Sequence, residues 1–426
     1  KMPENVLTSI RYLFYLFVLS IPVESASGET VAAIGAISMI FGMALMGAAL
    51  LQPGVCFNLP PGAFWYFVGY FVLCLTLAFT QNLDYLRPAL TRLFTFAQML
   101  VLMWICFNLL RYPEICKGAF LSLVAGCLVL SVMQVAGVGT VDVGHGRSSM
   151  SGADANTVGA TLSLGLIALV GITYGRTMVD RRLKLIAWVV FPIIGTAIIM
   201  TGSRGALLAL MFGIALLLLR GGTWRDKLKI GSIALLAVGF LVVTALSDEA
   251  MRTRLERSFY LGDTAGRDKI HAQAWAMFFE KPLLGWGPVY NLVELGSRLG
   301  MTTRDPHSLY LSVLTETGLF GSMLFFCGLG LLGRAAWQAR LRIEGALPIA
   351  MLGCLLAFNL TGSWHWRKLF WFTAAYVLAS AWPLRDTVQQ TPVQFTGSTN
   401  TIGQDLRTTE SFSQTTKGVS GAGPAR

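Results

Sequence analysis

One histidine in this sequence has the surroundings that a general base needs. His307 lies in the run Asp305-Pro306-His307-Ser308, directly before a long apolar stretch. Asp305 is a favourable helix N-cap and Pro306 suits the first helical position, so His307 is expected in the first turn of a helix. The positive end of the helix dipole disfavours a protonated imidazole there, and a neutral imidazole can accept a proton. The alternative is an interfacial histidine that only forms hydrogen bonds.

Three arginines could bind an anion. Arg204 opens one predicted helix and Arg267 opens another. A positive side chain at a helix N-terminus opposes the helix dipole unless an anion is bound, so a phosphate is the expected ligand. Asp268 could instead neutralise Arg267. Arg147 lies in a loop before a further apolar stretch, where a structural ion pair with Asp154 is the alternative to ligand binding.

The remaining polar candidates have weaker arguments for a chemical role. A metal site built from His271, Asp305 and His307 is not expected, because no HExxH or DxD-like element accompanies these residues. We therefore expect neither a metal nor a cofactor. The side chains that could simply be interfacial are those of His145, His271, His365 and Arg367.

The elements that position these residues are predicted to be membrane helices. Of the 426 residues, 54% are hydrophobic and 13% are charged, and the apolar runs are long enough to span a bilayer. The sequence therefore predicts an all-α polytopic membrane protein with about twelve transmembrane helices. The predicted spans cover residues 8–26, 31–51, 62–80, 88–110, 117–137, 155–175, 183–200, 204–219, 229–246, 308–333, 345–363 and 368–384.

The positions of Lys and Arg predict the orientation of these spans. Positive residues occupy every second connecting segment, which is typical of cytoplasmic loops. The net charge of +11 is therefore attributed to topology and not to nucleic-acid binding. Both termini are then expected in the cytoplasm, and His307 and the three arginines face the opposite side. The loop residues that set this orientation are Arg111, Lys117, Arg176, Arg181, Arg182, Lys184, Arg220, Arg225, Lys227, Lys229, Arg334, Arg340 and Arg342.

The chain is expected to have three parts. Residues 1–384 form the transmembrane bundle, and residues 247–309 form a long external loop inserted between the ninth and tenth spans. Residues 385–426 are rich in Thr, Ser, Gln and Gly and are expected to be a disordered cytoplasmic tail. Within the loop, residues 249–259 and 267–281 are predicted to be short helices. The second helix has an apolar stripe that could lie on the membrane or on the bundle, formed by Ile270, Ala274, Met277 and Phe278.

Several short motifs carry a resemblance to a known family. They are Thr201-Gly202-Ser203-Arg204-Gly205, then Gly266-Arg267 followed by Pro282-Leu283-Leu284-Gly285-Trp286-Gly287, and finally Pro306-His307-Ser308-Leu309-Tyr310-Leu311. In this order and spacing they resemble the O-antigen ligase and polymerase superfamily of bacterial inner membranes. The resemblance covers roughly residues 195–330. Ser308 departs from the pattern, since related sequences often carry Asn there.

The resemblance implies a GT-C-like membrane fold and a metal-independent, inverting glycosyltransferase that acts at the periplasmic face of the inner membrane. The implied donor is an undecaprenyl-diphosphate-linked glycan, and the implied acceptor for an O-antigen ligase is the lipid A-core oligosaccharide. His307 would deprotonate the acceptor hydroxyl. Arg204 and Arg267, with Arg147, would bind the donor diphosphate. The expected partners are thus these two substrates and membrane lipids, with no nucleic acid.

Two other functions remain open from the sequence. An O-antigen polymerase would instead join two lipid-linked repeat units. Polymerases of this superfamily often have an Arg followed eleven residues later by Gly in external loops, whereas here that spacing runs from Arg220 to Gly231 and from Arg342 to Gly353, with both arginines predicted in the cytoplasm. This difference favours the ligase. A lipid-linked glycan transporter is disfavoured, because the spans are nearly uncharged at their centres and no repeat relates the two halves.

Overall fold

The computed structural model describes residues 6–24, 32–58, 60–80, 83–142, 147–150, 153–174, 181–219, 224–262, 264, 266–341 and 345–382. The chain divides into a compact unit of Lys1–Arg385 and a second unit of Asp386–Arg426. The predicted tail 385–426, His145 and the first residues of the chain lie outside the described residues.

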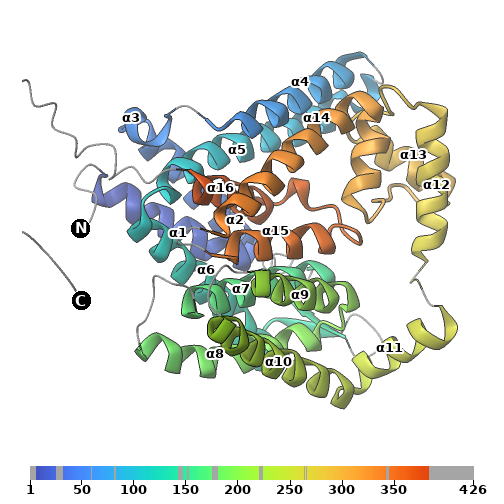
Figure 1. The fold of residues 1–426 in the computed structure, drawn as a ribbon. Coiled ribbons are helices and arrows are strands. Elements are labelled where there is room, and N and C mark those ends of the chain that lie inside the picture. Colours follow the sequence, from blue (N-terminus) through green and yellow to red (C-terminus); the bar gives the residue numbers. More distant parts are fainter. Residues whose placement is uncertain are drawn as a thin grey trace, which may run out of the picture. The chain divides into compact units, whose positions relative to one another are not determined.

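The first part of the described chain consists mainly of long apolar helices. α1 packs against α2 and α6, and α5 lies along α4 and α16 (Figure 1). Pro53 opens α3 and Pro113 opens α6, where the missing N–H of proline breaks no helical hydrogen bond. The elements are α1 (Thr8–Glu24), α2 (Ala32–Ala49), α3 (Pro53–Cys56), α4 (Gly62–Thr80), η2 (Leu83–Tyr85), α5 (Leu86–Leu110) and α6 (Pro113–Val135).

The middle of the chain supplies the helices that hold the candidate arginines. A short antiparallel ladder, in which Thr140 pairs with Met150, leads into α7. α7 then packs against α8, α9 and α15. The elements are β1 (Thr140–Asp142), β2 (Ser148–Met150), α7 (Ala155–Tyr174), α8 (Arg181–Met200), α9 (Arg204–Leu216), η3 (Leu217–Leu219) and α10 (Trp224–Ser247).

Three helices, not the two predicted, fill the segment between α10 and α14. α11 (Glu249–Leu261) and α12 (Arg267–Glu280) coincide with the two predicted helices, whereas α13 (Tyr290–Arg298) was not expected. α13 is amphipathic, but it is only nine residues long and has no side-chain cap, so the signals that mark the start of a helix are missing from its sequence. The predicted apolar stripe of α12 lies on the bundle and not on the membrane, because it packs with Leu295 of α13 and Leu311 of α14.

The last part of the chain contains the longest helix, and this helix is interrupted. α14 has non-helical backbone angles at Gly318, with φ 62° and ψ −157°. It packs along α4 and α16, where Phe67 contacts both Phe325 and Trp371 with ring centroids 5.4 and 5.0 Å apart. The elements are α14 (Leu309–Ala339), α15 (Leu347–Phe358), η4 (Trp364–Trp366) and α16 (Lys368–Ala381).

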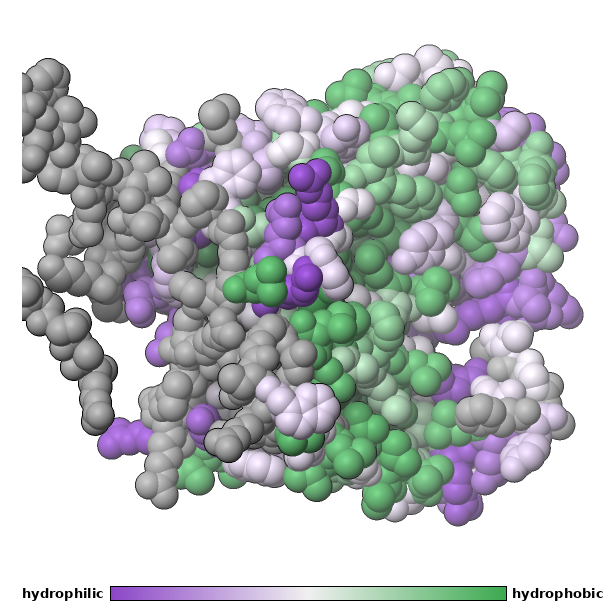
Figure 2. All heavy atoms as spheres, viewed as in Figure 1, coloured by the Kyte–Doolittle hydropathy of each residue, from purple (hydrophilic) through white to green (hydrophobic). Residues whose placement is uncertain are grey.

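The helices agree with an integral membrane protein. Each of the twelve predicted spans coincides with a helix, and five helices among the described residues are long and apolar enough to cross a membrane. Several others are apolar but shorter, so the number of spans stays a prediction. Figure 2 shows hydrophobic residues gathered over α4 and α14, and hydrophilic residues over α11 and the beginning of α12. The five long apolar helices are Gly62–Thr80, Leu83–Leu110, Pro113–Val135, Ala155–Thr173 and Leu309–Ala339.

Candidate functional site

His307 lies before α14 and not in its first turn, which corrects the expectation from the sequence. α14 begins at Leu309, and its first N–H donates to the carbonyl oxygen of Asn359 at 2.9 Å. His307 itself has a φ of 51°, in the left-handed region that non-glycine residues rarely adopt. The Asp305 carboxylate accepts the backbone N–H of His307 at 2.6 Å. Asp305 therefore caps a tight turn that presents His307, and it is not the N-cap of the helix.

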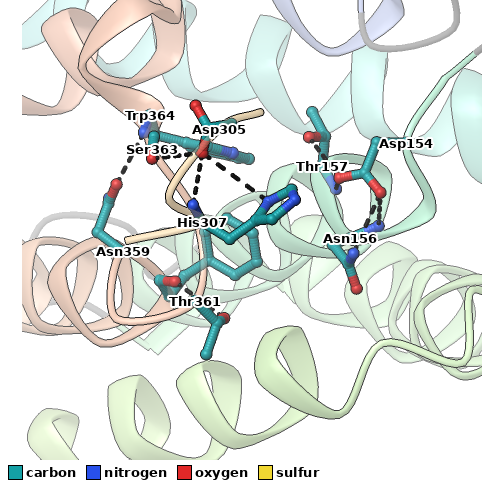
Figure 3. A network of polar contacts seen from close by, with 10 residues as sticks. Asp154, Asn156, Thr157, Asp305, His307, Asn359, Thr361, Ser363 and Trp364 are labelled. Carbon is teal, nitrogen blue, oxygen red and sulfur yellow. Dashed lines mark hydrogen bonds and ion pairs between the residues drawn. The ribbon is translucent and has the colours of Figure 1, made fainter. Parts of the chain in front are cut away.

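A connection from another part of the bundle holds Asp305 in place. Ser363, between α15 and η4, donates its hydroxyl to Asp305 Oδ1 at 2.8 Å (Figure 3). This connection is itself fixed, because the N–H of Trp364 donates to Asn359 Oδ1 at 2.9 Å. The same carboxylate oxygen of Asp305 lies 3.8 Å from Nδ1 of His307. One carboxylate thus contacts the backbone of His307 and faces its ring.

The other side of the His307 ring faces the start of α7. Figure 3 shows the imidazole turned toward Asp154 and Asn156, away from Ser363. Asp154 caps α7, accepting the backbone N–H of Thr157 at 3.1 Å and the side-chain amide of Asn156 at 3.1 Å. The His307 side chain is 38% exposed, so a ligand can reach it.

The surroundings of His307 favour its neutral form. Burial lowers the pKa of His307 below its ordinary value of 6.5. Asp305 acts in the opposite direction, while the positive charges of Arg304 and Arg267 lower the pKa further. The expected neutral imidazole is therefore supported, but burial is its main cause, since the residue precedes the helix.

The motif Thr201-Gly202-Ser203-Arg204 builds one wall of the site. Ser203 caps α9, as expected, by accepting the N–H of Ala206. Arg204 Nη1 donates to the carbonyl oxygen of Arg254 at 3.0 Å and to the hydroxyl of Ser258, so its guanidinium connects α9 to α11. Part of its donor capacity is thus used within the protein.

Arg147 passes over the same motif. Its Nε donates to the carbonyl oxygen of Thr201 at 3.1 Å. Gly202 leaves room for this side chain, because a Cβ atom there would lie 2.9 Å from Cγ of Arg147. Arg147 Nη2 is buried and makes no hydrogen bond with the residues that the structure describes. Such a donor is costly to bury unpaired, and an anion would satisfy it.

The structure brings the three predicted arginines within electrostatic reach of one another. Burial lowers the pKa of Arg267, and Arg204 and Arg147 lower it further. Burial also lowers the pKa of Arg147, with Asp154 opposing and Arg204 adding to the effect. The three positive charges repel one another, and a bound anion would relieve the repulsion. The arginines come from the loop before α7, from α9 and from α12, and Arg267 also lies within electrostatic reach of His307.

The motif Pro282-Leu283-Leu284-Gly285-Trp286-Gly287 docks the covering helices onto α14. At the break in α14, the N–H groups of Trp286 and Gly287 donate to the carbonyl oxygens of Thr315 and Glu316, each at 2.8 Å. On the other side of the break, Leu319 donates to Pro282 at 2.8 Å. The sequence singled out this run only as a family motif. Its role as a docking segment depends on a partner thirty residues away, which a local pattern does not reveal.

A buried polar cluster, which sequence reasoning missed, joins α4, α14 and η4. Glu316 accepts the hydroxyl of Tyr70 at 3.1 Å and lies 3.6 Å from Nε2 of His365. His365 was expected at the membrane interface, but its side chain is fully buried. The signal that could have found the cluster is a glutamate inside an otherwise apolar predicted span.

The other weaker candidates are placed around this site. His271 of α12 forms a hydrogen bond with the backbone of Pro306, and Arg267 and burial lower the pKa of its imidazole. Arg367 is exposed beyond η4. Among the residues that the structure describes, no group of three or more His, Cys, Asp or Glu side chains is arranged to hold a metal ion.

One comparison with known proteins finds a similarity to a family. Residues 188–326 match a family model described as O-antigen ligase. The match runs from α8 into α14 and includes Arg204, Arg267 and His307, but not Arg147. No curated protein matches the chain. The resemblance noted from the short motifs is thereby confirmed.

Proposed function

We propose that this chain, whose residues 188–326 match the O-antigen ligase family model, transfers a glycan from undecaprenyl diphosphate to the lipid A-core oligosaccharide. The family match supports a membrane enzyme of O-antigen ligase or polymerase type that acts on lipid-linked glycans. One observation carries the finer proposal. A partly exposed histidine, whose pKa is lowered by burial, lies within electrostatic reach of Arg267, which is one of three mutually repelling arginines.

The arginines are proposed to bind the donor diphosphate. A diphosphate carries the charge that relieves their repulsion, and guanidinium groups match phosphate oxygens with paired hydrogen bonds. Arg147 offers the buried, unpaired Nη2, and Arg267 offers a half-buried side chain at the start of α12. Because the diphosphate gains charge as it leaves, the same contacts stabilise the transition state.

His307 is proposed to act as the general base. Its Nδ1 faces Asp305, so Nε2 is the atom that would take the proton of the acceptor hydroxyl. The hydroxyl oxygen then forms a bond to the anomeric carbon while the bond from that carbon to the diphosphate breaks. The electron pair leaves with the lipid diphosphate, and a single displacement inverts the anomeric configuration. The proton on His307 then passes to solvent.

An apolar cavity could receive a section of the lipid chain of such a donor. It has a volume of about 280 Å³ and lies between α7, α8 and α10, with Trp188, Phe191 and Phe240 in its lining. Phe191 lies roughly 14 Å along the α8 axis from Met200, close to where the arginine-bearing motif begins. A lipid headed by a diphosphate at the arginines could thus extend an apolar chain toward this cavity.

The acceptor is tested with the full-length protein reconstituted in liposomes. Lipid-linked O-antigen and purified lipid A-core are supplied together, and the product is followed by gel mobility. A ligase attaches glycan to the core. Longer lipid-linked glycans formed without the core would indicate a polymerase, and movement of the lipid-linked glycan without transfer would indicate a transporter.

The contribution of the arginines is tested by Arg204→Ala and Arg267→Ala. Each is expected to lower transfer by about 100-fold, since charged transition-state contacts are worth several kcal/mol. Arg252→Ala is the matched control, because Arg252 is exposed and forms an ion pair with the exposed Glu256 on α11. Equal activity of the site variants and the control would argue against diphosphate binding at this cluster.

A further inference from the structure

Asp305 has more contacts with His307 than a turn requires. Its Oδ1 atom accepts the His307 backbone N–H at 2.6 Å and lies 3.8 Å from Nδ1 of the same residue. The second distance is beyond a hydrogen bond, although catalytic hydrogen bonds are often long before substrate binds. A small rotation of the exposed His307 ring would close it.

Asp305 is fixed from a separate part of the fold. Ser363 donates to the same Oδ1 atom at 2.8 Å, and it belongs to the connection between α15 and η4. That connection is anchored at both ends. On one side, the carbonyl oxygen of Asn359 accepts the N–H of Leu309 at 2.9 Å. On the other side, the carbonyl oxygen of His365 accepts the Trp371 indole N–H at 2.8 Å. The carboxylate is therefore held by two hydrogen bonds, and the imidazole beside it is partly exposed.

We propose that Asp305, held by Ser363, is a positioning residue that orients the His307 ring and keeps its proton on Nδ1. In that tautomer Nε2 carries the free electron pair and faces the start of α7, where an acceptor hydroxyl would approach. The carboxylate also stabilises the imidazolium formed when Nε2 takes the proton. This inference rests on the proposed role of His307 as the base.

The charges around His307 define the sign of the effect. Asp305 and Arg304 lie on its own segment, Arg267 and His271 come from α12, and Asp154 comes from α7. Asp305 favours the protonated imidazole, and the two arginines disfavour it. Removing the Asp305 charge alone therefore makes His307 less basic.

The test uses Asp305→Asn in the reconstituted full-length protein. The carboxamide oxygen can still accept from His307 N–H and Ser363, so the turn is retained while the charge is lost. We expect kcat to fall about 10- to 100-fold with an unchanged KM for the donor. The acid limb of the pH profile should move to lower pH. Ser363→Ala should act in the same direction but less strongly, and Ser363→Thr should restore the wild-type profile.

A second readout does not depend on transfer activity. The rate at which diethyl pyrocarbonate modifies His307 is measured against pH by peptide mass spectrometry, because the reagent attacks neutral imidazole. The midpoint should be lower in Asp305→Asn than in wild type. If the wild-type protein transfers glycan but neither the midpoint nor the acid limb moves, Asp305 is not the positioning residue. If the midpoint moves but the wild-type protein transfers no glycan, the pairing stands and the proposed function fails.

Discussion

Replacing Gly318 by alanine should detach the docking segment 282–287 from α14. The backbone of Gly318, at φ 62° and ψ −157°, is in a region that is essentially restricted to glycine. A Cβ atom there would lie 2.4 Å from the carbonyl carbon and oxygen of Leu283, and backbone atoms cannot move aside cheaply. The opposing Gly285 is equally close, since its Cβ would lie 2.7 Å from the backbone of Glu316.

The size of the effect follows from these contacts. The strained backbone costs about 1 to 3 kcal/mol for a non-glycine residue. Two hydrogen bonds across the break, from Leu319 to Pro282 and from Phe320 to Leu283, would be lost at about 0.5 to 1.5 kcal/mol each. Gly318→Ala should therefore lower the free energy of unfolding by about 2 to 6 kcal/mol.

The assay compares purified variants in detergent by thermal unfolding and by limited proteolysis of residues 281–288. Gly330→Ala is the matched control, because Gly330 lies in the same helix and an added Cβ would meet nothing within 4 Å. That control should be neutral or slightly stabilising, since alanine favours helix over glycine by about 1 kcal/mol. Equal stability and equal protease resistance of the two variants would refute the reasoning.

Three further predictions concern the site. The rate of transfer should stay high above the His307 pKa and fall as the pH drops through it, because only the neutral imidazole accepts a proton. Burial lowers this pKa, so the fall is expected below pH 6.5 in a pH–rate profile. Arg147→Lys should bind the donor more weakly than wild type, since lysine has no counterpart to the buried Nη2. Equal affinities of the two proteins in a donor titration would show that Nη2 does not bind the donor. Ser203→Ala should lower the free energy of unfolding by about 1 kcal/mol through loss of the α9 cap, and an unchanged melting temperature would contradict the capping role.

Local chemistry in the sequence was sufficient to predict several features of the site. Ser203 precedes an apolar run and caps α9, and apolar length alone located the helices that coincide with the twelve predicted spans, because both signals reside in neighbouring residues. The residue types of His307 and Arg204 indicated a base and an anion ligand. An imidazole can accept a proton and a guanidinium can bind an anion in any fold.

The features that were missed depend on contacts between distant segments. Asp305 was predicted to cap a helix, yet it caps a turn because Ser363, far along the chain, and Asn359 fix the segment before α14. The buried cluster of Glu316 and His365 likewise joins separate helices. Such contacts arise only when distant segments pack together, and a single sequence does not tell which distant residues come into contact.

The role of His307 is tested most directly by the single-turnover rate of glycan transfer in liposomes containing wild-type protein or His307→Ala. Lipid-linked O-antigen and lipid A-core are saturating, and Arg252→Ala serves as the control for folding. The predicted result is a fall of about 100-fold or more for His307→Ala, with donor binding retained, because the general base is lost. Transfer by His307→Ala at the wild-type rate would contradict the proposed reaction.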